Sequence, residues 1–351
     1  MELPSPSREA VRQRLQELSS RPRLAVEIVT GRASANFAAS MSAALARDLA
    51  PAGTAVTFRD LTEARVPCEA DLVLLVSQVH REESAYLTAL RDSAYGGVVV
   101  AWLWDNHHAR DRNLEVAKRA DITIAAHDCH ADYLTNHGLL FRSVMLGSAQ
   151  WTAHEARALW DSVDLTAARS QDLYGGFGRY RGSGRTAHLE RLIASAQYPA
   201  LYFVDGPKAQ GYFNYFAMSS EERFRHWARF AVSLCLPYRN DLGLRFFDAW
   251  LTGQIPIATS DIPELESDWA RPHRDRDFVL AASYEPADIN AAHARALELF
   301  RAGGRDGQVA RHRLALGHHL FQHRVERILA LLREAASHGV EAVRRPAAPA
   351  G

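Results

Sequence analysis

Short apolar runs that alternate with helical patterns are the strongest constraint on the fold of this chain. DLVLLVS at 71–77 and GVVVAWLW at 97–104 are examples, and between such runs lie segments with apolar residues at helical spacing. Continuous apolar strands separated by helices are typical of a parallel sheet that is covered on both faces. The first half of the chain contains six such runs, at 24–29, 55–58, 71–77, 97–104, 121–126 and 141–146.

The same rhythm restarts after a helix and connector at 151–170, which predicts a second α/β unit. Its strands are expected at 172–178, 200–206, 230–237, 254–260 and 277–283. A chain of 351 residues is long enough for two domains of ordinary size. We therefore predict an α/β fold of two Rossmann-like domains with a ligand cleft between them. The predicted parts are a first domain over 1–165, a second over 170–310, a terminal helix over 311–337 and a disordered tail over 338–351.

Composition and charge narrow the class of protein. Forty-one basic and 41 acidic side chains cancel, so no nucleic-acid partner is expected. No window approaches the roughly 18 unbroken apolar residues of a membrane span, and no secretory signal opens the chain, although peripheral membrane contact stays open. Cys68, Cys129 and Cys235 lie in or beside apolar runs without pair spacing, which predicts buried free thiols in a reducing compartment. A cytoplasmic protein is expected.

The stretch PYRNDLGLRFFDAWLTGQIPIATSD, residues 237–261, follows the predicted strand 230–237. Ligands of open α/β sheets bind beyond the carboxyl ends of the strands. The loop delivers a helix N-terminus there, whose amides and dipole favour a phosphate, and Gly243 keeps the backbone accessible. Asp248, one turn into the helix, could accept hydrogen bonds from ribose hydroxyls, and Asn240 could reach a sugar.

An alternative explanation of this stretch needs no ligand. Asn240 and Asp241 would cap the helix, and Asp248 would face solvent.

A glycine- and arginine-rich turn, YGGFGRYRGSGR at 174–185, leaves the first strand of the second unit. Its glycines allow close backbone approach, and its arginines suit a diphosphate. The residues concerned are Gly175, Gly176, Gly178, Arg179, Arg181 and Arg185. The turn is neither a Walker loop nor a dinucleotide fingerprint. The alternative is a flexible linker with solvated arginines.

Polar residues also follow the fourth strand of the first unit, in WLWDNHHARDRN. Asp105, His107 and His108 would project into the cleft, where one of them could accept a proton from an acceptor hydroxyl. The alternative is a helix cap formed by Asp105 or Asn106, with the histidines on the surface.

Weaker candidates follow two other strands of the first unit. His127 and Asp128 follow the fifth strand, where Asp128 could simply cap a helix, and Gly31 and Arg32 follow the first.

The stretch at 237–261 resembles the donor-site motif of GT-B glycosyltransferases of the family-4-like group and their CgeB-like relatives. In that motif two acidic residues stand eight positions apart with Gly and Leu between them, before a short helix and a Gly-x-Pro strand. Asn240 and Asp248 occupy the two acidic positions, and Gly243 and Leu244 match the inner pair. The following turn is matched by Gly253, Pro256 and Ser260. Asn240 departs from the pattern, since an acid is usual there.

The resemblance implies a glycosyltransferase that takes a sugar from a nucleoside diphosphate donor, with the second acid on the ribose and the first near the sugar. The implied donor-site residues are Gly176, Gly178, Arg179, Arg181, Arg185, Asn240, Asp241, Leu242, Gly243, Leu244 and Asp248. It further implies that Asp105, His107 or His108 supplies the base and that the terminal helix returns to the first domain. The acceptor would be a glycan, a lipid-linked sugar or a protein.

No cofactor and no metal are expected, because protein charges would stabilise the leaving group. Although the chain has 16 histidines, it contains no HExxH motif, and Asp275-Arg276-Asp277 is expected to be a surface turn. Two other functions stay open: a nucleotide-sugar epimerase of the same fold, and a non-catalytic module that binds a nucleotide or sugar.

Overall fold

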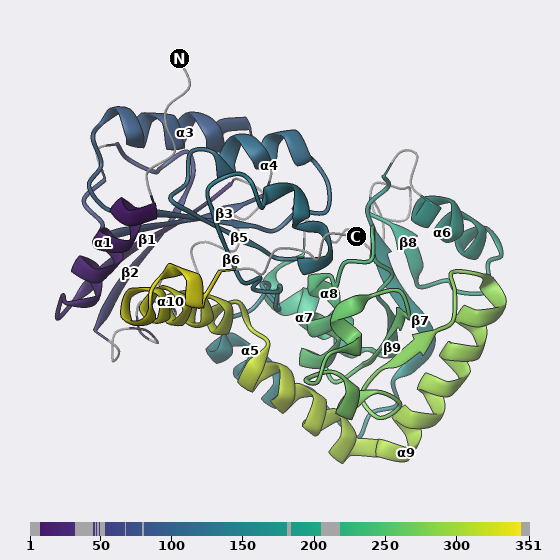
Figure 1. Ribbon diagram of the computed structural model, residues 1–351. Helices are drawn as coiled ribbons and strands as arrows, with labels where there is room; N and C mark the ends of the chain where they lie inside the picture. Colours follow the sequence, from purple (N-terminus) through teal and green to yellow (C-terminus); the bar gives the residue numbers. More distant parts are fainter. Residues whose placement is uncertain are drawn as a thin grey trace. The chain divides into compact units, whose positions relative to one another are not determined.

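The computed structural model describes residues 8–31, 45, 47, 49, 53–66, 68–78, 81–180, 184–204 and 218–344. Its contacts divide the chain into two compact units (Figure 1). The first unit combines Met1–Leu146 with Phe321–Gly351, and the second is Gly147–Leu320. Each unit is built on one parallel sheet, which confirms the predicted α/β class.

The sheet of the first unit has, within the described residues, six parallel strands in the order β2-β1-β3-β4-β5-β6. The interior strands β3 and β4 are buried along their whole length, which explains their unbroken apolar sequences. The strands are β1 (Leu24–Thr30), β2 (Thr54–Asp60), β3 (Leu72–Ser77), β4 (Val98–Leu103), β5 (Ile122–Ala125) and β6 (Leu139–Phe141).

Amphipathic helices accompany this sheet. Helix α3 (Arg81–Asp92), for example, packs Tyr86, Leu87 and Leu90 into a common core with Val73, Leu75 and other strand residues. The α-helices described in this unit are α1 (Arg8–Ser19), α3 (Arg81–Asp92), α4 (Arg110–Ala117) and α10 (Phe321–His338). Short 3-10 turns are η3 (Asp128–His130), η4 (Asp132–Leu134) and η8 (Val340–Ala342). The C-terminal helix α10 thus belongs to the first unit, where it packs against α1.

The second unit contains, in the described part of the chain, a five-stranded parallel sheet in the order β11-β10-β9-β7-β8. Its strands are β7 (Ser170–Phe177), β8 (Leu201–Phe203), β9 (Phe230–Leu234), β10 (Ile255–Thr259) and β11 (Val279–Ala281). All five fall at the positions predicted from apolar runs. The order reverses beside β7, since β8 pairs on one side of it and β9 on the other.

Two helices of the second unit begin with a side-chain cap. Capping boxes start α5, through Thr152 and Glu155, and α7, through Ser219 and Glu222. The helices are α5 (Ala153–Asp161), α6 (Gly184–Ala194), α7 (Ser220–Ala228), α8 (Leu244–Leu251) and α9 (Pro286–His318), with 3-10 turns η6 (Pro263–Glu266) and η7 (Arg271–His273). Non-helical backbone at Gly304 kinks α9.

The C-terminal end of α8 is fixed by α9. Arg311 donates two hydrogen bonds to the Gly253 carbonyl, at 3.1 and 3.0 Å, and His312 Nδ1 lies 2.6 Å from the Leu251 carbonyl. Gly253 has φ 77°, the left-handed conformation of a helix C-terminal glycine. These contacts satisfy the Leu251 carbonyl in the last turn of the helix and the Gly253 carbonyl just beyond it, so α9 holds the end of α8 in place.

The segments that enter and leave the second unit lie side by side. The Ser148 amide donates to the His319 carbonyl at 2.7 Å, and Ser148 pairs with Leu320 in a parallel bridge. This pairing explains a difference from the single terminal helix expected over 311–337. The helix breaks at His319 because that carbonyl accepts from Ser148, and α10 starts anew at Phe321.

The expected tail and sixth strand also differ from the structure. Residues 340–342 form η8, and Arg344 pairs with Phe141, so the chain stays ordered past 338. The run at 141–146 lies mostly after β6, which ends at Phe141. Residues 345–351 lie outside the described part.

Two smaller expectations concern cysteines and the Asp-x-Asp turn. None of the three cysteines, all of them in the described part, forms a disulfide; Cys235 is buried as predicted, but Cys129 is exposed. Asp275 is an exposed turn residue with φ 57°, whereas Asp277 is buried and bonded to His273 and Arg276.

No described helix combines the length and the apolar character needed to cross a bilayer.

Candidate functional site

The crevice expected from the topology of the second sheet lies between β7 and β9, where the strand order reverses. At such a point the loops that leave neighbouring strands diverge and make room for a ligand. The loop after β7 leads into α6, and the loop after β9 leads into α8. These are the two loops that the sequence predicted to bind the donor.

Two arginine side chains contact the ring of Phe177, the last residue of β7. The guanidinium carbons of Arg185 and Arg245 lie 5.7 and 5.1 Å from the ring centroid. Arg185 is 8% exposed and donates to the carbonyls of Gly178, at 3.1 Å, and Leu236, at 3.4 Å. Burial, and then the charge of Arg245, lower the pKa of Arg185. A bound anion would offset the repulsion between these two cations.

The N-terminus of α8 is open beside this pair. Its N-cap is Gly243, which has no side chain to satisfy the first amides of the helix. A Cβ built on Gly243 would meet no atom within 4 Å. Free space in front of aligned amides and the positive end of a helix dipole suits a phosphate group.

Asp241 and Asn240 shape the loop that precedes α8. Asp241 Oδ1 accepts from the amides of Tyr238, at 2.6 Å, and Arg239, at 3.0 Å. Asn240 is exposed and left-handed, with φ 58°, a conformation that asparagine tolerates better than most residues. The alternative in which these two residues cap the helix is therefore wrong, and a backbone requirement accounts for Asn at position 240.

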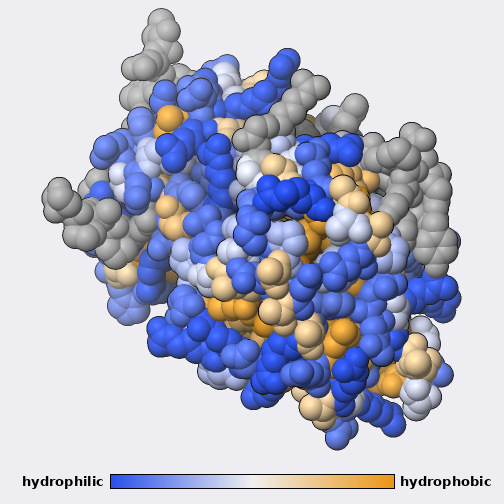
Figure 2. All heavy atoms as spheres, turned by 90° about the vertical axis from the view of Figure 1, so that its right-hand side faces the viewer, coloured by the Kyte–Doolittle hydropathy of each residue, from blue (hydrophilic) through white to orange (hydrophobic). Residues whose placement is uncertain are grey.

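An aromatic pair borders Arg185. The rings of Tyr180 and Tyr238 are 4.4 Å apart, and the Arg185 guanidinium carbon lies 4.7 Å from the first and 5.8 Å from the second. Hydrophilic residues cover most of the face in Figure 2. Among the described residues, the exposed large apolar side chains are Val66 and Tyr180. An exposed ring beside a cationic site can stack on a flat group of a ligand.

The glycines of the first turn have different roles. A Cβ on Gly175 would lie 2.6 Å from the Phe177 ring, and one on Gly176 would lie 2.8 Å from the Tyr202 ring. Packing within the sheet therefore requires both glycines. A Cβ on Gly178 would approach Tyr180 only to 3.8 Å, so Gly178 leaves room for a ligand.

The three arginines of the turn also differ. Arg179 lies over the Phe203 ring, with its guanidinium carbon 4.3 Å from the centroid, and Arg181 lies outside the described residues. The alternative of a linker with solvated arginines is wrong for Arg185, which is buried at the start of α6.

Asp248 is buried within the second unit. Its carboxylate accepts from Ser148 Oγ and from Gln150 Nε2, each at 2.6 Å. Burial raises its pKa to about 6, although the bonds from Ser148 and Gln150 act in the opposite direction. At 1% exposure Asp248 does not face solvent, so that alternative is wrong.

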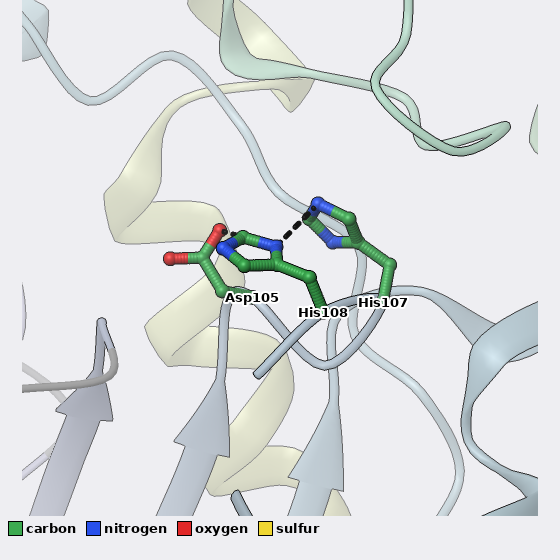
Figure 3. A group of neighbouring side chains, drawn as sticks. All are labelled: Asp105, His107 and His108. Atoms are coloured by element: carbon green, nitrogen blue, oxygen red, sulfur yellow. Dashed lines mark hydrogen bonds and ion pairs between the residues drawn. The ribbon is translucent and has the colours of Figure 1, made fainter. Parts of the chain in front are cut away.

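In the first unit, Asp105, His107 and His108 lie together on the loop between β4 and α4 (Figure 3). His107 Nε2 and His108 Nδ1 are 2.9 Å apart, and Asp105 Oδ1 lies 3.8 Å from His108 Nδ1. His107 is buried, whereas the side chains of Asp105 and His108 are 35% and 27% exposed. The N-cap of α4 is Ala109, with no side-chain cap, so the helix-cap alternative is wrong.

Two asparagines fix this loop. Asn106 exchanges hydrogen bonds with the backbone of His127, at 2.8 and 2.9 Å. Asn113 Nδ2 donates to the carbonyls of Asp105, at 3.0 Å, and His108, at 2.8 Å. The backbone on both sides of the histidine pair is therefore held by buried amides.

The weaker candidates are placed as follows. The His127 side chain is buried, and Asp128 accepts from Ser143 Oγ at 2.9 Å. Gly31 is described, but Arg32 is not.

Sequence reasoning missed Arg245, Ser148 and Gln150. Arg245 stands in the first turn of a helix whose start was predicted, so its position gave a usable signal. Ser148 and Gln150 are about 100 residues from Asp248, and no local pattern connects them.

No protein-family model and no curated protein sequence matches the chain. Similar solved structures include an alpha-glucosyltransferase in complex with UDP and a 13-mer DNA, with a TM-score of 0.59 and 12% identity over 88% of this chain and 99% of the other. An alpha-glucosyltransferase in complex with UDP-glucose and DNA containing an abasic site has a TM-score of 0.57 at 12% identity, with the same coverage. Sucrose-phosphate synthase from Thermosynechococcus elongatus has a TM-score of 0.50 at 13% identity, over 89% and 100%.

These similarities extend over both units and concern the fold. The chain has the architecture of GT-B glycosyltransferases, with two Rossmann-like units, which confirms the predicted fold class.

Proposed function

We propose that the chain is a glycosyltransferase that moves a sugar from a nucleoside diphosphate donor to an acceptor hydroxyl, and that it belongs to the family-4-like, CgeB-like group. The observation that carries the proposal is the pair Arg185 and Arg245 on Phe177, beside the open N-terminus of α8. The pair stands at the switch point of the second sheet, where α/β folds bind ligands. Structures of the same fold that contain UDP or UDP-glucose support the choice of donor.

Transfer breaks the bond between the anomeric carbon and a diphosphate oxygen. The acceptor oxygen bonds to that carbon, and its proton passes to a base. Negative charge grows on the departing diphosphate, and Arg185, Arg245 and the α8 amides would stabilise it. Because these positive groups are fixed in place, the proposal needs no metal at the diphosphate.

Other predicted donor residues enter the proposal around this pair. Gly178, Arg179 and Arg181 would line the phosphate side, and residues 240–244 would surround the diphosphate and the sugar. A ribose hydroxyl would donate to the Asp248 carboxylate in place of the Gln150 amide, which donates to it in this structure. Gly176 would act indirectly, since its lack of a side chain lets the strand pack against Tyr202.

Gly243→Ala tests whether the space before α8 receives the ligand. The added methyl group contacts no protein atom and the φ of −73° suits alanine, so the fold should lose less than about 1 kcal/mol. UDP affinity, measured by calorimetry, should fall by more than about tenfold, which is 1.4 kcal/mol. Gly317→Ala on α9, where a Cβ is also unobstructed, is the control and should bind UDP normally. Normal UDP binding by Gly243→Ala would place the phosphates elsewhere.

Asp105→Asn tests the base in the first unit. We propose that Asp105 or His108, which are both partly exposed, accepts the proton, while His107 orients His108. Turnover should fall by roughly 10²- to 10⁴-fold, the usual contribution of a general base, with unchanged donor affinity. Asp111→Asn, at an exposed position a few residues away, should keep full activity. Wild-type turnover in Asp105→Asn would remove Asp105 from the mechanism.

The function itself is tested with a panel of nucleotide sugars. Slow release of nucleoside diphosphate from one donor, accelerated by an acceptor, is the expected result. Tight binding without turnover of any donor would favour the non-catalytic module, and a changed sugar in the recovered donor would favour the epimerase. The acceptor panel should include glycans, lipid-linked sugars, proteins and duplex DNA, because the two glucosyltransferase structures described above contain DNA. An even charge balance alone does not decide against a nucleic-acid acceptor.

A further inference from the structure

We infer that Asp105, His107 and His108 form a binding site for a divalent transition-metal cation, with zinc as the reference ion. One ligand atom from each side chain lies within 4.8 Å of the other two (Figure 3). The site is contained in the first unit, apart from the donor site; it uses the side chains proposed above as the base, but its test measures metal binding alone.

The separations between the ligand atoms suit a small cation. Zinc binds histidine nitrogen at about 2.0–2.1 Å and carboxylate oxygen at about 2.0–2.2 Å, so two ligands in tetrahedral geometry stand about 3.4 Å apart. His107 Nε2 and His108 Nδ1 are 2.9 Å apart, and His108 Nδ1 and Asp105 Oδ1 are 3.8 Å apart. The two distances bracket the required one, so small side-chain rotations would place all three atoms around one ion.

The ligand types select the class of metal. Two imidazoles and one carboxylate form the donor set of many zinc and iron sites, whereas magnesium and calcium prefer oxygen alone. Three protein ligands leave at least one coordination position for water or a substrate oxygen. The partial exposure of Asp105 and His108 gives an ion access from solvent, while buried His107 closes the inner side.

The loop that carries the ligands is fixed before any ion arrives. Asn113 binds the carbonyls of both Asp105 and His108, and Asn106 ties the intervening backbone to His127. Inside the loop, the His108 amide donates to the Asp105 carbonyl at 3.1 Å. A held backbone lowers the entropy that ligands lose on coordination, which strengthens metal binding.

This inference departs from the expectation of no metal. The HExxH motif carries its two histidines one turn apart on a helix, whereas these ligands lie in a turn at positions 105, 107 and 108. Adjacent histidines meet there because the chain reverses direction before α4, with Ala109 in the left-handed conformation at φ 51°.

The test is metal binding by the full chain after treatment with a chelator, without nucleotide. Cobalt should bind with one equivalent per chain and give the visible absorption of a nitrogen- and oxygen-ligated ion, and zinc should displace it. His108→Ala and Asp105→Asn should each weaken zinc binding by more than about 100-fold, beyond the 10–100-fold that the loss of a supporting contact costs. Both changes are at partly exposed positions, so unaltered circular dichroism and melting temperature of the metal-free variants should confirm folding.

His130→Ala and His154→Ala are the matched controls. The His130 ring lies 6.3 Å from that of His107, outside the proposed ligand set, and His154 is exposed on α5. Both variants should bind zinc as tightly as the wild type does. Unchanged zinc affinity in His108→Ala and Asp105→Asn overturns the inference, as does a loss in His130→Ala equal to that in His108→Ala. Neither result concerns sugar transfer, which the donor panel tests separately.

Discussion

Replacing Arg185 and Arg245 together with methionine should abolish measurable binding of UDP and of pyrophosphate. A hydrogen bond to a charged group is worth about 1.5–3 kcal/mol, so each single change should weaken binding by roughly 10- to 150-fold. Methionine keeps an unbranched apolar chain against Phe177, so the packing on that ring is kept, while the hydrogen bonds from Arg185 to the Gly178 and Leu236 carbonyls are lost with the charge. Pyrophosphate is the sharper ligand, because it contains only the group that the arginines are proposed to hold.

The control for this pair is Arg239→Met. Arg239 is exposed on the same loop, with its guanidinium carbon 5.4 Å from the Tyr238 ring. Arg239→Met removes one positive charge from the same region, so an unspecific electrostatic effect would also weaken pyrophosphate binding in this variant. Full pyrophosphate binding by the double variant would refute the donor site, and an equal loss in Arg239→Met would refute its specificity.

Asp248→Asn should change how stability depends on pH. The pKa of Asp248 is raised from 3.8 to about 6, so the folded state holds the proton more tightly than the unfolded state. The stability that Asp248 contributes is therefore fully present below about pH 4 and is lost as the pH rises through about 6. A shift of about two pH units corresponds to about 3 kcal/mol, so the difference in unfolding free energy, wild type minus Asp248→Asn, should fall by that amount between pH 4 and 7.

Asparagine is the informative replacement because it can keep both contacts. Its oxygen can accept from Ser148, and its amide can donate to Gln150 once the Gln150 amide turns over. Asp248→Ala would instead leave two buried donors without an acceptor.

Asp164→Asn supplies a control of opposite sign for the pH experiment. Asp164 is exposed, and its bonds from Thr166 lower its pKa. Its contribution to stability is present above about pH 4 and is lost as the pH falls further, so its difference curve should rise with pH below pH 4 and stay level between pH 4 and 7. Urea unfolding at several pH values measures the stability of all three proteins, and parallel curves for wild type and Asp248→Asn would contradict the assigned pKa.

The ribose proposal is checked on Asp248→Asn, which should lose affinity for UDP but keep its affinity for pyrophosphate.

The strands and their order of appearance were predictable because both faces of each sheet are buried. A strand such as LVLLVS contacts apolar neighbours on every side, so burial is written into consecutive residues. The position of the candidate site is predicted from the same information, since ligands collect at the carboxyl ends of such strands. The start of α8 after Gly243 and the turn at Gly253 were likewise local features that a single stretch of chain specifies.

Features that depend on distant residues were not predictable. The helix breaks at His319 because the His319 carbonyl accepts a hydrogen bond from the Ser148 amide. The Asp248 carboxylate accepts hydrogen bonds from Ser148 and Gln150, which are about 100 residues away in sequence. Gly175 and Gly176 looked like ligand-binding glycines, but a side chain at these positions would meet Leu201 and Tyr202 of the neighbouring strand β8. In each case the missing information is a contact between segments that only the folded chain brings together.

The pairing of Ser148 with Leu320 has a consequence for synthesis. The second unit is one unbroken segment whose two ends meet, so all of it emerges from the ribosome before α10 does. The first unit lacks α10 until then, although Phe321, Val325 and Ile328 belong to its buried interior. Since domains fold as units during translation, the half of the chain that is synthesised first is the half that is completed last.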